Sequence, residues 1–197
     1  MKRFASIFLS LLVIYFVTGC NGSSSSTPPT TDSSAVKPDS VAANTGSTAG
    51  FKLGVQMWTF RMFSFSDALD KVDSSGIKNI EAFIGQNLGG GMSGKYGLDM
   101  SAETITKLKA LLAKHGIQAV AMGVIVPKNK AEWVKTFELA KNLGMSYITA
   151  EPIKNQWDMV DSLAGAYGIS VAIHDHPKPN MYWSQDSVLA AIQGHSH

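Results

Sequence analysis

The stretch AKHGIQAVAMGV, residues 113–124, joins the end of an expected helix to an expected buried strand. Gly116 stands where helices commonly end, because glycine adopts the left-handed conformation that closes the last turn. From Ile117 onward the residues are apolar or small, apart from Gln118, which is typical of a strand covered on both faces. The stretch therefore predicts one helix-to-strand junction of an α/β fold.

The same junction recurs along the chain. The sequences NLGM and AYGI place Gly144 and Gly168 at helix ends, and Ser101 and Asn129 are expected to cap helix starts. Apolar residues three and four positions apart indicate helices between the strands. Repeated βα units of this size predict a parallel sheet with right-handed crossovers. The expected strands are residues 53–59, 77–84, 117–126, 145–150 and 169–173.

Two α/β architectures fit these five units. One is a doubly wound sheet, which would be complete, and the other is a (β/α)₈ TIM barrel, which typically needs about 250 residues. Side-chain alternation favours the barrel, because one face of each expected strand is apolar and the other carries small and polar groups that suit a barrel interior. We therefore expect a TIM barrel that stops after about five βα units here, with roughly 80 further residues in the natural protein.

The first 50 residues predict an export signal followed by a flexible tether. Lys2 and Arg3 precede an apolar run over residues 7–17, which predicts a signal peptide at 1–19. The run is short for a transmembrane helix, which needs about 20 apolar residues. A membrane anchor with an accidental cysteine is the alternative. Residues 20–50 are rich in Ser, Thr, Pro and Gly and predict a flexible linker before a folded domain at 51–197.

The sequence VTGC, which ends at Cys20, resembles a bacterial lipobox. That resemblance implies a lipid on Cys20 and a place on the periplasmic side of a bacterial membrane, with the outer membrane as the expected one. Cys20 is the only cysteine, so no disulfide forms within the chain. Two of the 17 basic residues lie in the signal, which leaves 15 against 15 acidic residues. A neutral mature chain gives no electrostatic reason to expect nucleic acid as a partner.

Polar residues follow the expected strands at one end. The fifth strand runs into SVAIHDHPKP, residues 170–179, and the fourth runs into Glu151. By side-chain parity His174, His176 and Glu151 face the barrel interior, and so does Glu81 on the second strand. The carboxyl ends of parallel strands are where α/β barrels build their sites, so we expect a candidate site there.

Five segments in order resemble the xylose isomerase-like TIM barrels, and within them the secreted proteins labelled sugar phosphate isomerase/epimerase. The segments are LGVQMWTFR, IKNIEAF, AKHGIQAVAMGV, YITAEP and GISVAIHDHPKP, and the likeness covers about 51–197. The resemblance implies acid–base chemistry on a carbonyl-bearing sugar. It also implies a divalent metal (Mn²⁺, Co²⁺, Zn²⁺ or Mg²⁺), for which Glu151, His174 and His176 are the candidate ligands. The family often has glutamate where this chain has His174, and it has further ligands on later strands.

Each candidate has a structural alternative. The candidate catalytic residues are Glu151, His174 and Glu81, and the candidate substrate-binding residues are Trp58, Phe83, His176 and Lys178. Glu151 could instead cap the next segment, and the histidines could be hydrogen-bonded pocket residues. Glu81 could pair with Lys52 or Lys78, and the two aromatic residues could belong to the core. The glycine run 89–91 lacks a following Lys-Ser/Thr, so we interpret it as a mobile active-site loop.

Three functions follow from these residues. The first is a metal-dependent sugar isomerase or epimerase that removes a proton next to a carbonyl and forms an enediolate. The second is a lyase or hydrolase that uses the same step on a keto-sugar glycoside and then expels the aglycone. The third is a non-catalytic carbohydrate-binding fragment. Hydrogen exchange next to the carbonyl separates the first two from the third, and only the lyase releases an aglycone.

Overall fold

The computed structural model describes residues 51–197, which fall within one structural unit. The predicted signal peptide, Cys20 and the linker at 20–50 lie outside the described residues. Among the helices of residues 51–197, none combines the length and the apolar composition needed to cross a bilayer.

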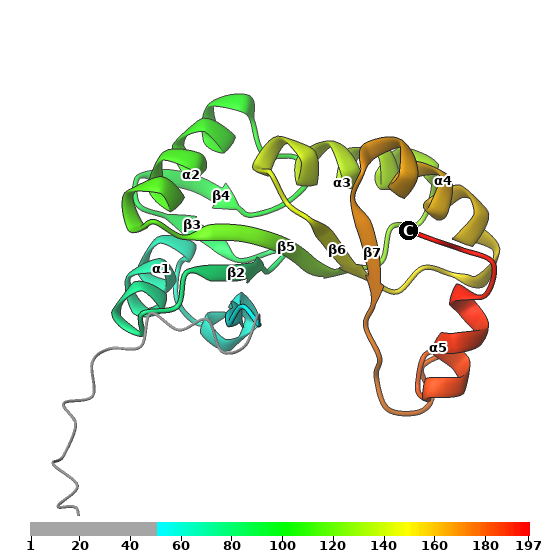
Figure 1. Ribbon diagram of the computed structural model, residues 1–197. Helices are drawn as coiled ribbons and strands as arrows, with labels where there is room; N and C mark the ends of the chain where they lie inside the picture. The colour runs from blue at the N-terminus through cyan, green and yellow to red at the C-terminus, as the bar shows by residue number, and fades with distance from the viewer. Residues whose placement is uncertain (1–50) are drawn as a thin grey trace, which may run out of the picture. The chain divides into compact units, whose positions relative to one another are not determined.

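The five predicted strands form one parallel sheet (Figure 1). The order in the sheet is β1-β2-β5-β6-β7, which follows the order along the chain. A doubly wound sheet would reverse its order at a switch point, so the sequential order is that of a barrel wall. The strands are β1 (Gly54–Gln56), β2 (Asn79–Ala82), β5 (Gln118–Ile125), β6 (Tyr147–Ala150) and β7 (Ser170–Ile173).

Helices connect the strands, and their ends confirm the predicted caps. The side chains of Ser101 and Asn129 accept hydrogen bonds from backbone N–H groups at the starts of α2 and α3. Gly116, Gly144 and Gly168 end three helices in the left-handed conformation. The helical elements are η1 (Met57–Phe60), α1 (Phe65–Ser74), α2 (Ala102–His115), α3 (Lys130–Leu143), η2 (Lys154–Gln156), α4 (Trp157–Tyr167) and α5 (Gln185–Ile192).

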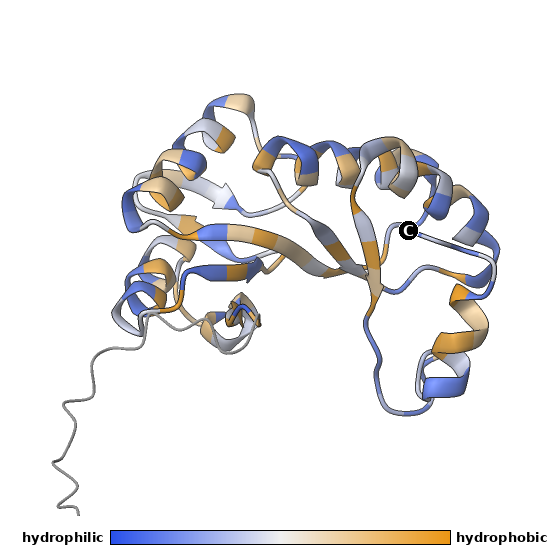
Figure 2. Cartoon of the chain, viewed as in Figure 1, coloured by the Kyte–Doolittle hydropathy of each residue, from blue (hydrophilic) through white to orange (hydrophobic). Residues whose placement is uncertain are grey.

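One face of the sheet packs against helices, and the other carries the small and polar residues. Met122 pairs in register with Ile148, and both are fully buried in the hydrophobic core. On the opposite face Tyr147 is 37% exposed. In Figure 1, α2, α3 and α4 lie along one side of the sheet, while the hydrophilic segment after β7 leads away to α5 (Figure 2). The predicted alternation is therefore confirmed on β6, and the inner face is the face without these helices. On β5 the alternation is interrupted, because the register shifts against β2 between Ile80 and Glu81 and against β6 between Met122 and Ile125.

The glycine run at 89–91 is part of a β-hairpin, so the prediction of an irregular loop is wrong, while its mobility and its place in an active site stay predictions. Strands β3 (Asn87–Gly89) and β4 (Met92–Lys95) pair antiparallel across the glycines. Leu88, Met92 and Tyr96 are buried, and the Tyr96 ring stacks on Phe65 of α1 with centroids 5.6 Å apart. A Cβ at Gly89 would lie 2.4 Å from Ser64 Oγ, so the close approach of the hairpin to α1 requires glycine there.

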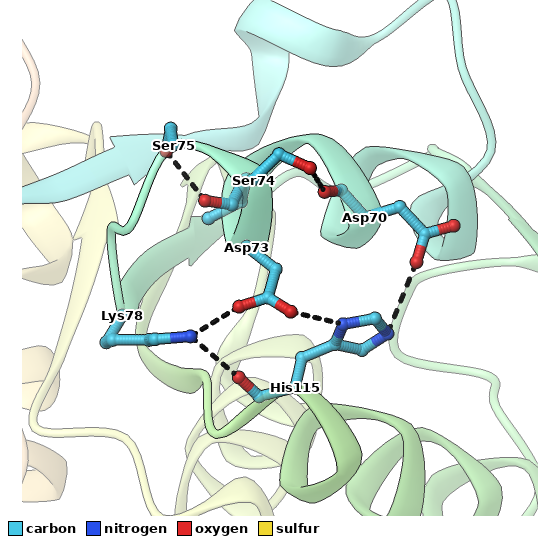
Figure 3. A network of polar contacts seen from close by, with 7 residues as sticks. Asp70, Asp73, Ser74, Ser75, Lys78 and His115 are labelled. Atoms are coloured by element: carbon cyan, nitrogen blue, oxygen red, sulfur yellow. Dashed lines mark hydrogen bonds and ion pairs between the residues drawn. The ribbon is translucent and has the colours of Figure 1, made fainter.

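A polar network joins α1, α2 and the segment before β2 (Figure 3). The imidazole of His115, 8% exposed, lies 3.3 Å from Asp73 and 3.5 Å from Asp70. Lys78 forms an ion pair with Asp73 and donates to the His115 carbonyl oxygen at 3.1 Å. The suggested pairing of Lys78 with Glu81 is therefore wrong, because Lys78 is engaged with Asp73. Hydrogen bonds from Lys78 and then from His115 lower the pKa of Asp73 below its usual value.

We expect Asp73→Asn to lower the free energy of unfolding at pH 7 but not in acid. A folded-state pKa below the unfolded value contributes stability above about pH 3.9, and that stability is lost as the pH falls through the folded-state pKa. Urea unfolding of both proteins from pH 7 to pH 2.5 measures the difference. Asp99→Asn, which removes an exposed ion pair with Lys135, is the control and should have little effect. A difference that does not shrink with acid would contradict the prediction.

Candidate active site

The candidate site lies where β6 and β7 end on the inner face of the sheet. Glu151 follows β6 directly, and its backbone N–H donates to the Ile125 carbonyl at 3.1 Å. The backbone N–H of His174 donates to the Ala150 carbonyl at 3.0 Å. These two bonds continue the sheet ladder by one residue on each strand. The two candidate residues are therefore positioned by the sheet itself, at the edge where barrels place their chemistry.

Both carboxylate oxygens of Glu151 have partners. One oxygen is in contact with Nδ1 of His176, and the other accepts a hydrogen bond from Nδ2 of Asn180 at 2.8 Å. The Glu151 side chain is only 13% exposed, whereas that of His176 is half exposed. The carboxylate is thus fixed in orientation from two sides while its imidazole partner faces solvent.

The segment between β7 and α5, residues 174–184, is anchored beneath this carboxylate. Asn180 accepts a hydrogen bond from the Tyr182 backbone N–H at 2.7 Å. The buried Tyr182 hydroxyl donates to the Pro152 carbonyl and accepts from Trp157 Nε1 at 3.0 Å. Burial raises the pKa of Tyr182 and the negative charge of Glu151 adds to this, while the bond from Trp157 acts in the other direction. The hydroxyl therefore stays a donor that holds the segment in place.

Sequence reasoning missed Asn180 and Tyr182. Asn180 carries no periodic signal, because it follows a cis Lys178–Pro179 bond in irregular chain. Tyr182 offered a weak signal, since a buried aromatic residue with a polar tip is a common anchor in a polar segment. Only the contact with Glu151, 29 residues earlier, identifies Asn180 as part of the site.

The two histidines lie against each other. The rings of His174 and His176 have centroids 4.6 Å apart and meet nearly edge to face. Within residues 51–197, no three His, Cys, Asp or Glu side chains are arranged to hold a metal ion together. The Glu151 oxygen and the His176 nitrogen are suitable ligand atoms in contact, yet catalytic zinc sites usually have three protein ligands. Glu151 and His176 thus fit as two ligands of a divalent-metal site, and the residues that the structure describes do not supply a complete ligand set.

Glu81 lies on the same inner face, two strands away from Glu151. It pairs in register with Ala121 of β5. A Cβ built on Gly123 would lie 2.9 Å from Glu81 Oε1 and 2.4 Å from the Thr149 carbonyl oxygen. The Glu81 carboxyl group therefore lies over Gly123, beside β6. Its Oε1 is buried and has no hydrogen-bond partner among the described residues.

The aromatic candidates follow β1 and β2. The Trp58 and Phe83 rings meet edge to face with centroids 4.7 Å apart, and Trp58 is 52% exposed. The Arg61 guanidinium carbon lies 4.8 Å from the centroid of the Trp58 ring. Lys178, the remaining candidate, places its ammonium 3.8 Å from the ring centroid of Trp183. The structure thus leaves an accessible indole after β1, while the roles of these residues in substrate binding stay predictions.

Protein-family models gave no match to this sequence, and neither did the curated proteins. Solved structures do resemble it. An uncharacterized protein from Parabacteroides distasonis ATCC 8503 is 34% identical over 74% of this chain and 60% of its own, with a TM-score of 0.68. A xylose isomerase-like TIM barrel/4-hydroxyphenylpyruvate dioxygenase fusion protein is 12% identical over 75% of this chain and 26% of its own, with a TM-score of 0.55. A sugar phosphate isomerase/epimerase from Parabacteroides distasonis ATCC 8503 is 17% identical over 66% of this chain and 53% of its own, with a TM-score of 0.49.

The first two of these likenesses establish the fold. The chain spans 60% of the length of the first of these structures. Its five strands in sequential order correspond to part of a xylose isomerase-like TIM barrel, so the predicted fold class is confirmed. At 12% identity the fusion protein shows the shared fold alone.

Proposed function

We propose that this chain belongs to a sugar isomerase or epimerase that removes a proton next to a carbonyl group. The observation that carries the proposal is the Glu151 carboxylate, held by His176 and Asn180 at the carboxyl edge of a partial TIM barrel. A base fixed in orientation at that edge is what proton abstraction from a bound sugar needs. The fold shared with a xylose isomerase-like TIM barrel fusion protein is compatible with this proposal.

The proposed step begins when a carboxylate oxygen of Glu151 takes a proton from the carbon next to the sugar carbonyl. The electron pair of the broken C–H bond forms a C=C bond, and the carbonyl π pair moves to oxygen, which gives an enediolate. Return of a proton to the former carbonyl carbon, together with transfer of the neighbouring hydroxyl proton to the former carbonyl oxygen, isomerises the sugar. Return of a proton to the opposite face of the original carbon epimerises it. His176 and Asn180 orient the carboxylate during these transfers.

We further propose a divalent cation as the cofactor, with Mn²⁺, Co²⁺, Zn²⁺ and Mg²⁺ as candidates. Glu151 and His176 are the residues in contact that would hold it, together with ligands beyond this pair. When bound, such an ion would stabilise the negative charge that develops on the sugar oxygen. Because the described residues supply only part of its ligand set, the proton transfer above is assigned to the protein's own groups.

The remaining proposals concern location and partners, and they rest on the sequence. We propose that a lipid on Cys20 anchors the protein on the periplasmic side of the outer membrane, with residues 20–50 as the tether. The partner is a small sugar, and the charge balance provides no basis for nucleic acid. Trp58 and Phe83 are proposed as the apolar platform for that sugar, because an accessible ring can stack on the face of a pyranose or furanose.

Hydrogen exchange tests the proposed reaction. The protein is incubated in D₂O with a panel of free ketoses and aldoses, with Mn²⁺ or with EDTA, and NMR follows the signal of the proton next to the carbonyl. We expect loss of that signal and the appearance of an isomer or epimer, with faster turnover when Mn²⁺ is present. Sugars that bind without any exchange would contradict the proposal and favour a binding module. Release of an aglycone from keto-glycosides would favour the lyase.

A further inference from the structure

We propose that Glu81 is the second proton-transfer residue of this reaction and delivers the proton that completes it. The inference rests on the proposed function and adds a residue to it. In this scheme Glu151 removes the proton from the carbon next to the carbonyl, and the Glu81 carboxylic acid protonates the enediolate at the carbon or face that gives product. Glu151 then releases its proton to solvent and Glu81 regains one from solvent, so each turnover is balanced.

The first observation is that Glu81 has no protein partner. Among residues 51–197 it makes no hydrogen bond or ion pair, and its Oε1 is one of two buried side-chain atoms left without a partner. Lys78, three residues earlier, is engaged with Asp73 on the other side of the sheet. Burying a carboxyl oxygen without a donor is costly, so natural proteins rarely do so without a reason. A carboxyl group that gains and loses a proton in each turnover can do so more readily when no neighbouring cation holds it in the ionised form.

The second observation is that packing alone holds this carboxyl group. Oε1 is buried, and it lies so close to Gly123 that a Cβ built on that residue would be 2.9 Å from Oε1. The residue as a whole is only half-buried, so part of it is open to solvent. Glu81 therefore combines an enclosed, unpartnered oxygen with an exposed part of the same residue.

The third observation relates Glu81 to Glu151. Thr149, whose carbonyl oxygen crowds the same Cβ position of Gly123 as Glu81 Oε1 does, is two residues before Glu151, and alternation along the extended chain places the Thr149 and Glu151 side chains on one face. Two residues of extended strand span about 6.6 Å. Glu81 and Glu151 thus lie on one face near the carboxyl end of β6, and they approach it from different strands.

Glu81→Gln separates the two proton transfers. In D₂O we expect this variant to keep exchanging the hydrogen next to the carbonyl, because Glu151 still removes and returns it. Conversion to product should fall about 100-fold or more, since general acid catalysis contributes about 10²–10⁴-fold. The variant would then accumulate deuterated substrate without product. Glu103→Gln, an exposed glutamate paired with Lys107 on α2, is the matched control and should keep both rates.

The outcomes are distinct. Conversion by Glu81→Gln at the wild-type rate would overturn the inference, and so would a loss of exchange in parallel with conversion. No exchange by the wild-type protein would instead overturn the proposed function. Circular dichroism and thermal unfolding check that the variant is folded. If Glu81→Gln does not fold, Glu81→Ala is tested instead with added formate. We expect formate to restore conversion in that variant. A folded Glu81→Ala protein that converts the sugar normally without formate would overturn the inference.

Discussion

Replacing Glu151 by glutamine is expected to abolish measurable hydrogen exchange and turnover together. Glutamine has the same shape but cannot accept the proton, so the first step loses its base. General base catalysis contributes about 10²–10⁴-fold, and we expect kcat/KM and the exchange rate to fall by that factor. NMR in D₂O with the sugar that the wild-type protein turns over provides both rates in one experiment.

In Glu151→Gln the side-chain carbonyl oxygen can still accept the hydrogen bond from Asn180, but an amide NH₂ replaces the carboxylate oxygen that contacts His176. Thermal unfolding of the variant should therefore be measured beside its activity. Glu103→Gln is again the matched control, because it removes a carboxylate that is exposed and far along the chain from the site. Exchange by Glu151→Gln at a rate near that of the wild type would show that another group is the base, and the proposed role of Glu151 would be wrong.

Replacing Gly123 by alanine is expected to destabilise the protein and to inactivate it. The new Cβ would lie 2.4 Å from the Thr149 carbonyl oxygen and 2.7 Å from Thr149 Cβ, and neither atom can rotate away. Strand β5 must then shift relative to β6, and overpacking of this kind costs about 1–3 kcal/mol. The same Cβ also displaces the Glu81 carboxyl group, so conversion should fall even in the fraction that stays folded.

Urea unfolding measures the change in the free energy of unfolding. The matched control is Gly97→Ala, because a Cβ at Gly97 meets no atom within 4 Å and its backbone needs no positive φ. Alanine at such a position leaves stability unchanged or raises it by about 0.4–1 kcal/mol, through the unfolded chain. Equal stability of Gly123→Ala and wild type would contradict the close approach of β5, β6 and Glu81.

Local sequence patterns determined the positions of the strands and of the main helices. The buried runs at 117–126 and 145–150 became β5 and β6, because apolar runs of this length between glycine-capped helices have few other ways to bury their surface. The helix ends at Gly116 and Gly144 followed from backbone conformation alone. Parity also placed Glu81 and Glu151 on one face, since side chains alternate along any strand.

The hairpin at 87–95 could not be predicted in the same way. Its glycines indicate turns, but whether such a segment is mobile or packed depends on whether Leu88 and Tyr96 find apolar partners. The ring that stacks on Tyr96 belongs to Phe65 of α1, 31 residues earlier along the chain. A local window therefore contains the turn chemistry but not the packing that orders the segment.

By itself, the sequence determined the βα repeat, the inner and outer faces of most strands, and the position of Glu151 and His176 after the ends of β6 and β7. Only the tertiary structure decided that the strands follow chain order, that Asn180 and Tyr182 complete the surroundings of Glu151, and that Glu81 lies unpaired over Gly123. The physical reason is the range of the interactions. Alternation, caps and turns are encoded by neighbouring residues, whereas strand order and hydrogen bonds across 25 or more residues depend on which surfaces the folded chain buries together.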